Sequence, residues 1–388
     1  MSAFAQLRKV ALLFLIGAIG AGGLASGLAL FHFWLFLRLP AAPGERQVRE
    51  VKIEPGMDGA AIARLLESEG VISDGRLFRL LSLLKQSGHK LRAGEYGFSS
   101  LATPEEILHQ IVTGRGIIHR ITLPEGSNVY DVARILEQSG LASGKEIIRI
   151  ASDRDQIKRL LGLPVSSLEG FLFPETYHFQ KIQSSLAMLE KMTREFWRHF
   201  PESWRQRSLE TGLSIQEVVV LASMVEKEAV VDSERPLIAA VFLNRLKKGM
   251  PLQSDPTSVY DLPDFSGPIT AAHLKRLSPY NTYVNKGLPV GPICNPGAKS
   301  LKAVLYPEPA RYLYFVSQND GTHHFSETFE EHHLAVGRYQ EKRKRVEAQE
   351  KPMQRPAPGE PSTVEIPPRS DPATHGIGIL ERKERRPM

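Results

Sequence analysis

Residues 51–73 and 121–143 share one pattern of hydrophobic and polar positions, at an offset of 70 residues. In each stretch, alternating apolar residues lead to a glycine turn, after which apolar residues recur at helical spacing until a further glycine. This weak internal repeat predicts a short strand, a turn and an amphipathic helix in each copy. Identical positions in the two copies include Ala63/Ala133, Arg64/Arg134, Leu66/Leu136, Glu67/Glu137, Gly70/Gly140 and Ser73/Ser143.

The rest of the chain alternates helical and strand patterns, which predicts a mixed α+β fold. Helices are predicted at residues 103–114, 145–160, 185–200, 214–230 and 329–350. Strands are predicted at residues 91–99, 311–317 and 322–326, the last two as a hairpin. Residues 168–179 are expected to be extended or looped. Residues 251–300 are rich in Pro, Gly and Tyr, and they form a segment too long for a plain connection.

The helix predicted at 214–230 carries two glutamates near its end, in the stretch LASMVEKEA. Ser214 and Glu217 form an S-x-x-E capping box at its start. At about 100° per residue, Glu226 lies on the arc of the apolar residues, whereas Glu228 lies near the opposite side. We therefore predict that Glu226 points into the interior, and that Glu228 is a surface residue or supports the site from behind.

An interior carboxyl group allows two interpretations. Burial disfavours the charged form of a carboxyl group, so such a group can remain protonated and act as a general acid. Alternatively, Glu226 forms an ion pair with an interior arginine such as Arg235 or Arg245. Helical periodicity alone leaves both interpretations open.

The N-terminus changes the picture, because residues 10–37 contain no Asp, Glu, Lys or Arg. These 28 residues are long enough to span a bilayer core of about 30 Å. A cleaved signal peptide is the alternative, but its apolar region would be shorter. We predict an uncleaved transmembrane anchor at 10–37 after a short cytoplasmic tail at 1–9, with membrane lipid as its partner.

Composition and charge disfavour several further kinds of partner and site. The formal net charge is +6, and the basic run at 342–345 is more typical of a solvated helix end than of a nucleic-acid surface, so no nucleic-acid partner is predicted. The lone Cys294 cannot form an internal disulfide. Adjacent histidines at 323–324 would point to opposite faces of a strand, which disfavours the alternative of a metal site there. Residues 346–388 are expected to form a disordered, proline-rich tail.

Three stretches supply polar and aromatic side chains that suit neutral amino sugars. Hydrogen-bonding groups and aromatic faces at 252–260, 278–297 and 170–177 are our candidates for substrate contacts or for orienting Glu226. The candidates are Gln253, Asp255, Thr257, Tyr280, Asn281, Thr282, Tyr283 and Glu175. For Tyr280 and Tyr283, packing in the core is the alternative.

The segments ASMVEKEA, VFLNRLKKGMPLQSDPTSVY, SPYNTYVNKGLPVGPICNPGAKSLKAVLYP, YLYFVSQNDGTHHFSET and EGFLFPETY resemble the endolytic murein transglycosylase family (MltG/YceG-like). The resemblance covers roughly residues 10–342, and its motifs are long and specific. It implies a bacterial inner-membrane, single-pass protein with a periplasmic or extracytoplasmic catalytic domain. It also implies a lyase that cuts nascent glycan strands internally and leaves 1,6-anhydro ends, with no cofactor. The catalytic glutamate of the family falls on Glu226.

Together these expectations define the domain organisation. A linker at 38–50 follows the anchor, and the resemblance implies a LysM-like domain at 51–120. A catalytic domain at 121–345 begins with the second repeat and contains the buried helix that carries Glu226. Peptidoglycan strands are the expected partner, and peptidoglycan synthases are candidate partners. Two alternatives are a two-carboxylate glycoside hydrolase that uses Asp255 or Glu175, and a wall-binding scaffold without catalysis.

Overall fold

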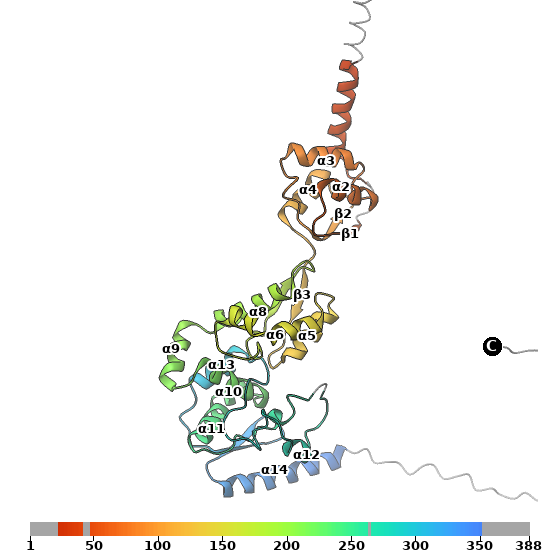
Figure 1. Cartoon of the computed structure of the whole chain (residues 1–388). Helices are drawn as coiled ribbons and strands as arrows, with labels where there is room; N and C mark the ends of the chain where they lie inside the picture. The colour runs from red at the N-terminus through yellow and green to blue at the C-terminus, as the bar shows by residue number, and fades with distance from the viewer. Residues whose placement is uncertain (1–21, 42–46, 263–264, 351–388) are drawn as a thin grey trace, which may run out of the picture. The chain divides into compact units, whose positions relative to one another are not determined.

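The computed structural model describes residues 22–41, 47–262 and 265–350 (Figure 1). Residues 47–115 form a small unit with its own core. Strand β1 (Val48–Ile53) pairs antiparallel with β2 (Gly94–Ser99), and helices α2 (Gly59–Ser68) and α3 (Gly75–Leu84) lie between them in the chain. Helix α4 (Pro104–Thr113) follows, with the predicted Thr103 cap in place. The core of this unit includes Val51, Ile53, Ile62, Leu66, Phe78, Leu81, Tyr96, Phe98, Ile107 and Ile111.

The second repeat forms a similar unit, again with helices between two antiparallel strands. Strand β3 (His119–Thr122) pairs antiparallel with β4 (Thr176–Phe179), and three helices lie between them in the chain. These helices are α5 (Val129–Gln138), α6 (Gly144–Ala151) and α7 (Arg154–Leu161). The helix predicted at 145–160 is therefore two helices, because the Asp153 side chain caps a new one.

The repeated residues have matching structural roles. Leu66 and Leu136 are fully buried, and Gly70 and Gly140 both have positive φ, at 66° and 68°. A glycine tolerates this left-handed conformation, which ends each helix. The internal repeat inferred from the hydrophobic pattern is thus a repeat of structure.

The remaining elements enclose one long buried helix, α10 (Ile215–Glu228), which has the predicted capping box at Ser214. Residues 218–225 of α10 are all buried, and α10 packs against α11 (Arg235–Lys247) and α13 (Ala298–Leu305). The other helices are α8 (Ser185–His199), α9 (Glu202–Thr211), α12 (Ala271–Leu274) and α14 (Phe329–Glu350). Two 3₁₀ turns, η1 (Asp232–Glu234) and η2 (Asp255–Ser258), and a hairpin of β5 (Tyr314–Ser317) and β6 (His323–Ser326) complete the domain.

The N-terminal prediction falls partly outside the described residues, as do residues 351–388 of the predicted tail. Within them, an apolar helix runs over Gly22–Arg38, and its Phe36 is buried in the core of the first unit. No single helix in the described ranges has the length and hydropathy of a membrane span. Helices α9 and α10 reach that length and hydropathy only when taken together, and the two helices are bent by 93° relative to each other.

Candidate functional site

Glu226 lies in the last turn of α10, and its side chain is 5% exposed. The Arg235 guanidinium donates to Oε1 of Glu226 through Nη1 at 2.9 Å, and the backbone N–H of Gly297 donates to Oε2 at 2.9 Å. Each carboxylate oxygen is therefore held by one strong donor. The Glu226 side chain therefore points into the interior, as helical phase predicts. It also forms an ion pair with Arg235, the alternative that periodicity left open.

Arg235, the first residue of α11, connects Glu226 to two neighbours. Its Nη1 also donates to the Ser300 hydroxyl at 2.5 Å, and its Nε donates to Asp232 at 3.1 Å. Asp232 in turn accepts a hydrogen bond from Lys299. The arginine is 7% exposed, so its position is fixed by packing as well as by its partners.

A second carboxyl group, that of Glu125, lies beside this pair. It belongs to the turn after β3, and a Cβ added to Gly297 would lie 1.8 Å from its Oε1. Partial burial and the neighbouring Glu226 raise the pKa of Glu125, while Arg235 and Lys299 oppose this effect. A side chain at 297 would therefore displace the Glu125 carboxyl group, because both glutamates approach this residue.

The turn that carries Glu125 is fastened to the end of α10 and to the segment before Gly297. Lys227 donates to the Gly126 carbonyl at 2.9 Å, and the Gly126 N–H donates to the Asn295 carbonyl at 3.1 Å. The Asn295 side chain is buried, donates to the Ser127 carbonyl and accepts from the Leu172 N–H.

Glu169 lies at the centre of the buried network behind the turn. It accepts from the Val129 N–H at 2.9 Å, the Tyr260 hydroxyl at 2.7 Å and the Asn295 amide at 3.2 Å. Burial raises the pKa of Glu169 to about 7, against these donors, which favour its charged form. Residues far apart in the chain thus hold the Glu125 turn in place.

Glu228 contacts a different part of the chain. Ser254 donates to its Oε1 at 2.6 Å, and burial raises the pKa of Glu228, as does the nearby Asp255. A surface location for Glu228 is therefore wrong. Helical phase places it on the far side of α10 from Glu226, but the segment before η2 covers that side.

Comparisons with known proteins identify the family of this chain. The YceG-like family matches residues 51–338. The chain belongs to the YceG-like family. The endolytic murein transglycosylase of Bacillus subtilis is 31% identical over 314 residues, which cover 77% of this chain and 87% of that protein. The Streptococcus pneumoniae (strain D39) protein of the same name is 26% identical over 346 residues, covering 81% and 62%.

A solved structure gives the same assignment. The crystal structure of a yceG-like protein from Listeria monocytogenes superposes with a TM-score of 0.52 at 30% identity. The match covers 75% of this chain and all of that one. In this chain the YceG-like fold is a mixed α+β architecture with small two-stranded sheets and a buried helix, α10, that carries Glu226 in its last turn.

The other predicted site residues of this YceG-like chain fall into two groups. Thr257, Asn281 and Thr282 are buried and bond to other residues of the segment 251–300: Thr257 and Thr282 bond each other at 2.8 Å, and Asn281 donates to the Arg276 carbonyl at 2.7 Å. These side chains shape the loop around Ser254. They do not point to solvent where a sugar could reach them.

The second group lies nearer the surface. The Tyr283 hydroxyl donates to Asp255, and Gln253 accepts from Arg245 at 3.1 Å. Tyr280 packs against Tyr260, with ring centroids 4.6 Å apart, so core packing accounts for much of its role. Glu175 is exposed at the start of β4, where its carboxylate accepts from the Thr176 N–H.

Sequence reasoning missed Glu125, Glu169 and Asn295. Two of them lie in segments that carry the family resemblance. Glu169 begins EGFLFPETY, and Asn295 begins the NPG of the long segment SPYNTYVNKGLPVGPICNPG. Glu125 lies in the second repeat, where its order with proline is the reverse of that in the first copy. The described residues contain no cluster of three or more His, Cys, Asp or Glu that could hold a metal ion, and His323 pairs with Glu234 at 2.8 Å.

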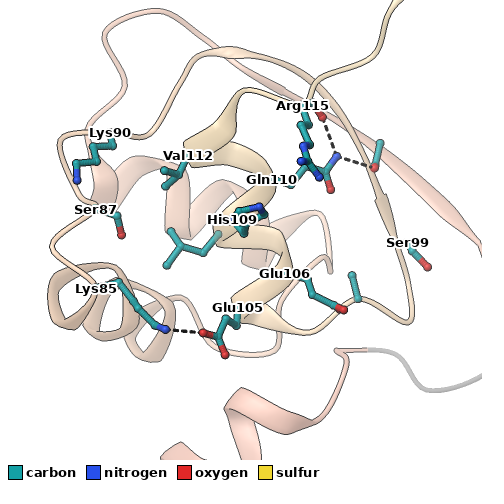
Figure 2. Close-up of a pocket in the computed structure, with 13 residues that line it drawn as sticks. Lys85, Ser87, Lys90, Ser99, Glu105, Glu106, His109, Gln110, Val112 and Arg115 are labelled. Atoms are coloured by element: carbon teal, nitrogen blue, oxygen red, sulfur yellow. Dashed lines mark hydrogen bonds and ion pairs between the residues drawn. The ribbon is translucent and has the colours of Figure 1, made fainter.

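Two hollows are notable in the described structure. One of about 370 Å³ borders the Glu226 pair, because Arg235 lines it together with Asp232, Lys299, Lys302 and Tyr306. The other, of about 900 Å³, lies on the first unit, and Figure 2 shows Lys85, Lys90, His109, Gln110 and Arg115 around it. Polar and basic side chains over an apolar floor of Leu108 and Val112 suit a carbohydrate or an acidic polymer.

Proposed function

We propose that this protein is a membrane-anchored endolytic lytic transglycosylase of peptidoglycan. It cleaves bonds between N-acetylmuramic acid and N-acetylglucosamine in nascent strands and leaves 1,6-anhydro ends. The observation that carries the proposal is the interior Glu226 carboxyl group, oriented by Arg235 and Gly297. It occurs in a chain whose relatives are named endolytic murein transglycosylases.

One carboxyl group can perform both proton transfers in this reaction. Glu226 first gives its proton to the glycosidic oxygen as the bond from the muramic anomeric carbon to that oxygen breaks. The 6-hydroxyl of the same sugar then attacks the anomeric carbon, and Glu226 takes the proton that this hydroxyl loses. The carboxyl group ends as it began, and no water enters the product.

The surroundings of Glu226 support each half of this cycle. The Arg235 and Gly297 donors hold the carboxylate in the orientation in which it acts as a base. For the acid step the carboxyl group must carry a proton, which weakens its pair with Arg235. Arg235 retains Asp232 and Ser300 as partners, so its charge stays compensated during that step.

The other parts of the chain extend the proposal. The N-terminal apolar segment anchors the protein in the bacterial inner membrane, with the catalytic domain outside the cytoplasm. The first unit acts as a LysM-like module whose hollow beside Lys90 and Arg115 holds glycan or positions the catalytic domain. Cleavage of strands that are still being made would end their elongation, next to the synthases that make them.

The test is product analysis on purified glycan strands with the Glu226→Gln variant. We expect the wild type to release anhydro-ended products and the variant to release at least 10³-fold less, since the acid and base are lost. Glu202→Gln, an exposed site on α9, is the matched control and should behave as wild type. Thermal unfolding checks that both variants fold.

Mass spectrometry separates the alternatives. A hydrolase gives products heavier by one water, about 18 Da, and would use a second carboxylate such as Asp255, Glu175 or the neighbouring Glu125. A scaffold binds strands and releases nothing with either form of residue 226. Anhydro products at wild-type rates from Glu226→Gln would refute the proposed mechanism.

A further inference from the structure

Helix α3 of the first unit exposes an apolar face that no described residue covers. Leu80, Leu83 and Leu84 are 42%, 60% and 64% exposed, whereas Phe78 and Leu81 on the same helix are buried. At 3.6 residues per turn, the three leucines and the exposed Arg76 and Arg79 fall within an arc of roughly 140°. Three exposed leucines along one helix face form a patch of the kind that binds a membrane or a protein.

The charge of residues 75–94 favours a membrane over a protein as the binding partner of this face. Residues 75–94 contain five cationic side chains and no Asp or Glu, with Arg76 and Arg79 on the exposed arc itself. An amphipathic helix with leucines flanked by arginines is the pattern that lies in the interface of an anionic bilayer. The cationic residues are Arg76, Arg79, Lys85, Lys90 and Arg92.

The end of α3 also lies near the end of the N-terminal apolar helix. Glu105 pairs with Lys85, the C-cap of α3, at 2.5 Å, and its pKa is lowered by Lys85 first and also by Arg38, the last residue of helix Gly22–Arg38. Figure 2 shows the Lys85–Glu105 pair. Phe36 of that helix is buried in the core of the first unit. If the N-terminal helix enters the bilayer, α3 is held within reach of the bilayer surface.

We propose that α3 docks on the membrane, with Leu80, Leu83 and Leu84 inserted at the headgroup level and Arg76 and Arg79 against anionic phosphates. This inference rests on the anchoring part of the proposed function. Docking fixes the first unit against the bilayer, so the orientation of that unit does not depend on the anchor helix alone.

The experiment uses the full chain in liposomes of phosphatidylcholine and phosphatidylglycerol that contain nitroxide-labelled lipid. A fluorophore is attached to Leu83→Cys. Leu28→Cys, in the N-terminal helix, reports anchoring, and Leu209→Cys, in α9, is the matched exposed leucine, 73% exposed. Cys294 is fully buried, and the unsubstituted chain reports its background labelling.

We expect strong quenching at positions 28 and 83 and none at 209. Replacing phosphatidylglycerol with neutral lipid, or introducing Arg76→Glu with Arg79→Glu, should lower quenching at 83 at least twofold and leave position 28 unchanged. Quenching at 28 with none at 83 overturns the docking of α3 while anchoring stands. An unquenched but blue-shifted label at 83 would assign the face to a protein partner and equally overturn it. Quenching at 83 without quenching at 28 would support docking and refute the anchor.

Discussion

The turns that follow β1 and β3 have the same backbone but different surroundings. The first contains Glu54, Pro55 and Gly56, and the second contains Pro124, Glu125 and Gly126, with glutamate and proline in reversed order. The two glycines have φ of 86° and 78°. The closing hydrogen bonds match as well, from Met57 to Glu54 at 3.4 Å and from Ser127 to Pro124 at 3.2 Å.

Their neighbours differ completely. Glu54 pairs with Lys52 at 2.8 Å in solvent, and no atom lies within 4 Å of a Cβ added to Gly56. The second turn instead contacts the end of α10, and the Glu226 Cγ lies 3.8 Å from a Cβ added to Gly126. The same turn therefore contributes to a site only where other elements, here the end of α10, pack against it.

The largest expected difference between the two regions is the loss of folding stability when the ion pair of each region is broken. Arg235→Ala removes one partner of a buried pair and should lower the free energy of unfolding of the catalytic domain by about 3–5 kcal/mol. Lys52→Ala breaks a solvent-exposed pair and should leave the free energy of unfolding close to that of the wild type. Urea unfolding of both variants measures this, and equal losses would remove the energetic distinction between the regions.

The second-largest expected difference between the two regions is in how their folding stability depends on pH. The buried carboxyl and guanidinium groups of the described structure lie in the catalytic domain, while the first unit buries the hydroxyl groups of Ser82, Ser87 and Tyr96. The folded-state pKa of Glu169 is raised from 4.5 to about 7, so its contribution to stability is complete below pH 4.5 and is lost as pH rises through 7. The shift corresponds to roughly 3 kcal/mol.

Glu169→Gln should abolish most of this fall. Chemical unfolding at pH 5 and pH 8 gives the difference for wild type and variant. A variant that retains the wild-type difference would show that another group is responsible.

A smaller effect is expected from Glu125 itself. Glu125→Gln removes a charge beside Glu226 and should lower kcat/KM on glycan strands by about tenfold, a change of about 1.4 kcal/mol. Glu54→Gln, at the first turn, should leave kcat/KM unchanged. A tenfold loss from both variants would point to a general effect of net charge.

A double-mutant cycle sharpens this result. Gly297→Ala should displace the Glu125 side chain, since the added methyl overlaps it. The double variant should therefore be no worse than the more impaired single variant. Additive losses would mean that Gly297 acts on the site independently of Glu125.

The smallest effect concerns the caps that follow the two turns. Asp58 and Asn128 cap α2 and α5 through side-chain acceptors, so alanine at either position should cost about 1 kcal/mol. Only Asn128→Ala should also lower activity, because it follows the Glu125 turn. Thermal unfolding and glycan cleavage, measured side by side, check this.

Sequence predicted most of the fold because the hydrophobic periods are strong. The repeat, α4, α8, α10, the hairpin and α14 all follow from local pattern and capping residues. Helices α9, α11 and α13 went unpredicted, and the hydrophobic face of α9 is weak. The interior orientation of Glu226 follows from the same periodicity, because Val219 and Ala222, seven and four residues before it on the same face of α10, are buried.

The surroundings of the site could not be predicted in this way. Helical phase describes one helix alone, so it could not show that Ser254 covers Glu228. Asn281 and Thr282 have side chains typical of sugar contacts, but they bond to Arg276 and Thr257 inside the folded segment 251–300. Glu169 and Asn295 are 126 positions apart, and only tertiary packing brings them together.

Tandem units of similar construction also shape how the chain folds. Strands β1 and β3 each precede helices that return the chain to an antiparallel partner, β2 or β4. Such neighbouring repeats are prone to exchange strands during refolding. Only seven of the 23 positions in each copy are identical. Strands β1 and β2 have six residues each, whereas β3 and β4 have four each. Each strand therefore matches the length of the partner within its own unit, which disfavours exchange between the two units.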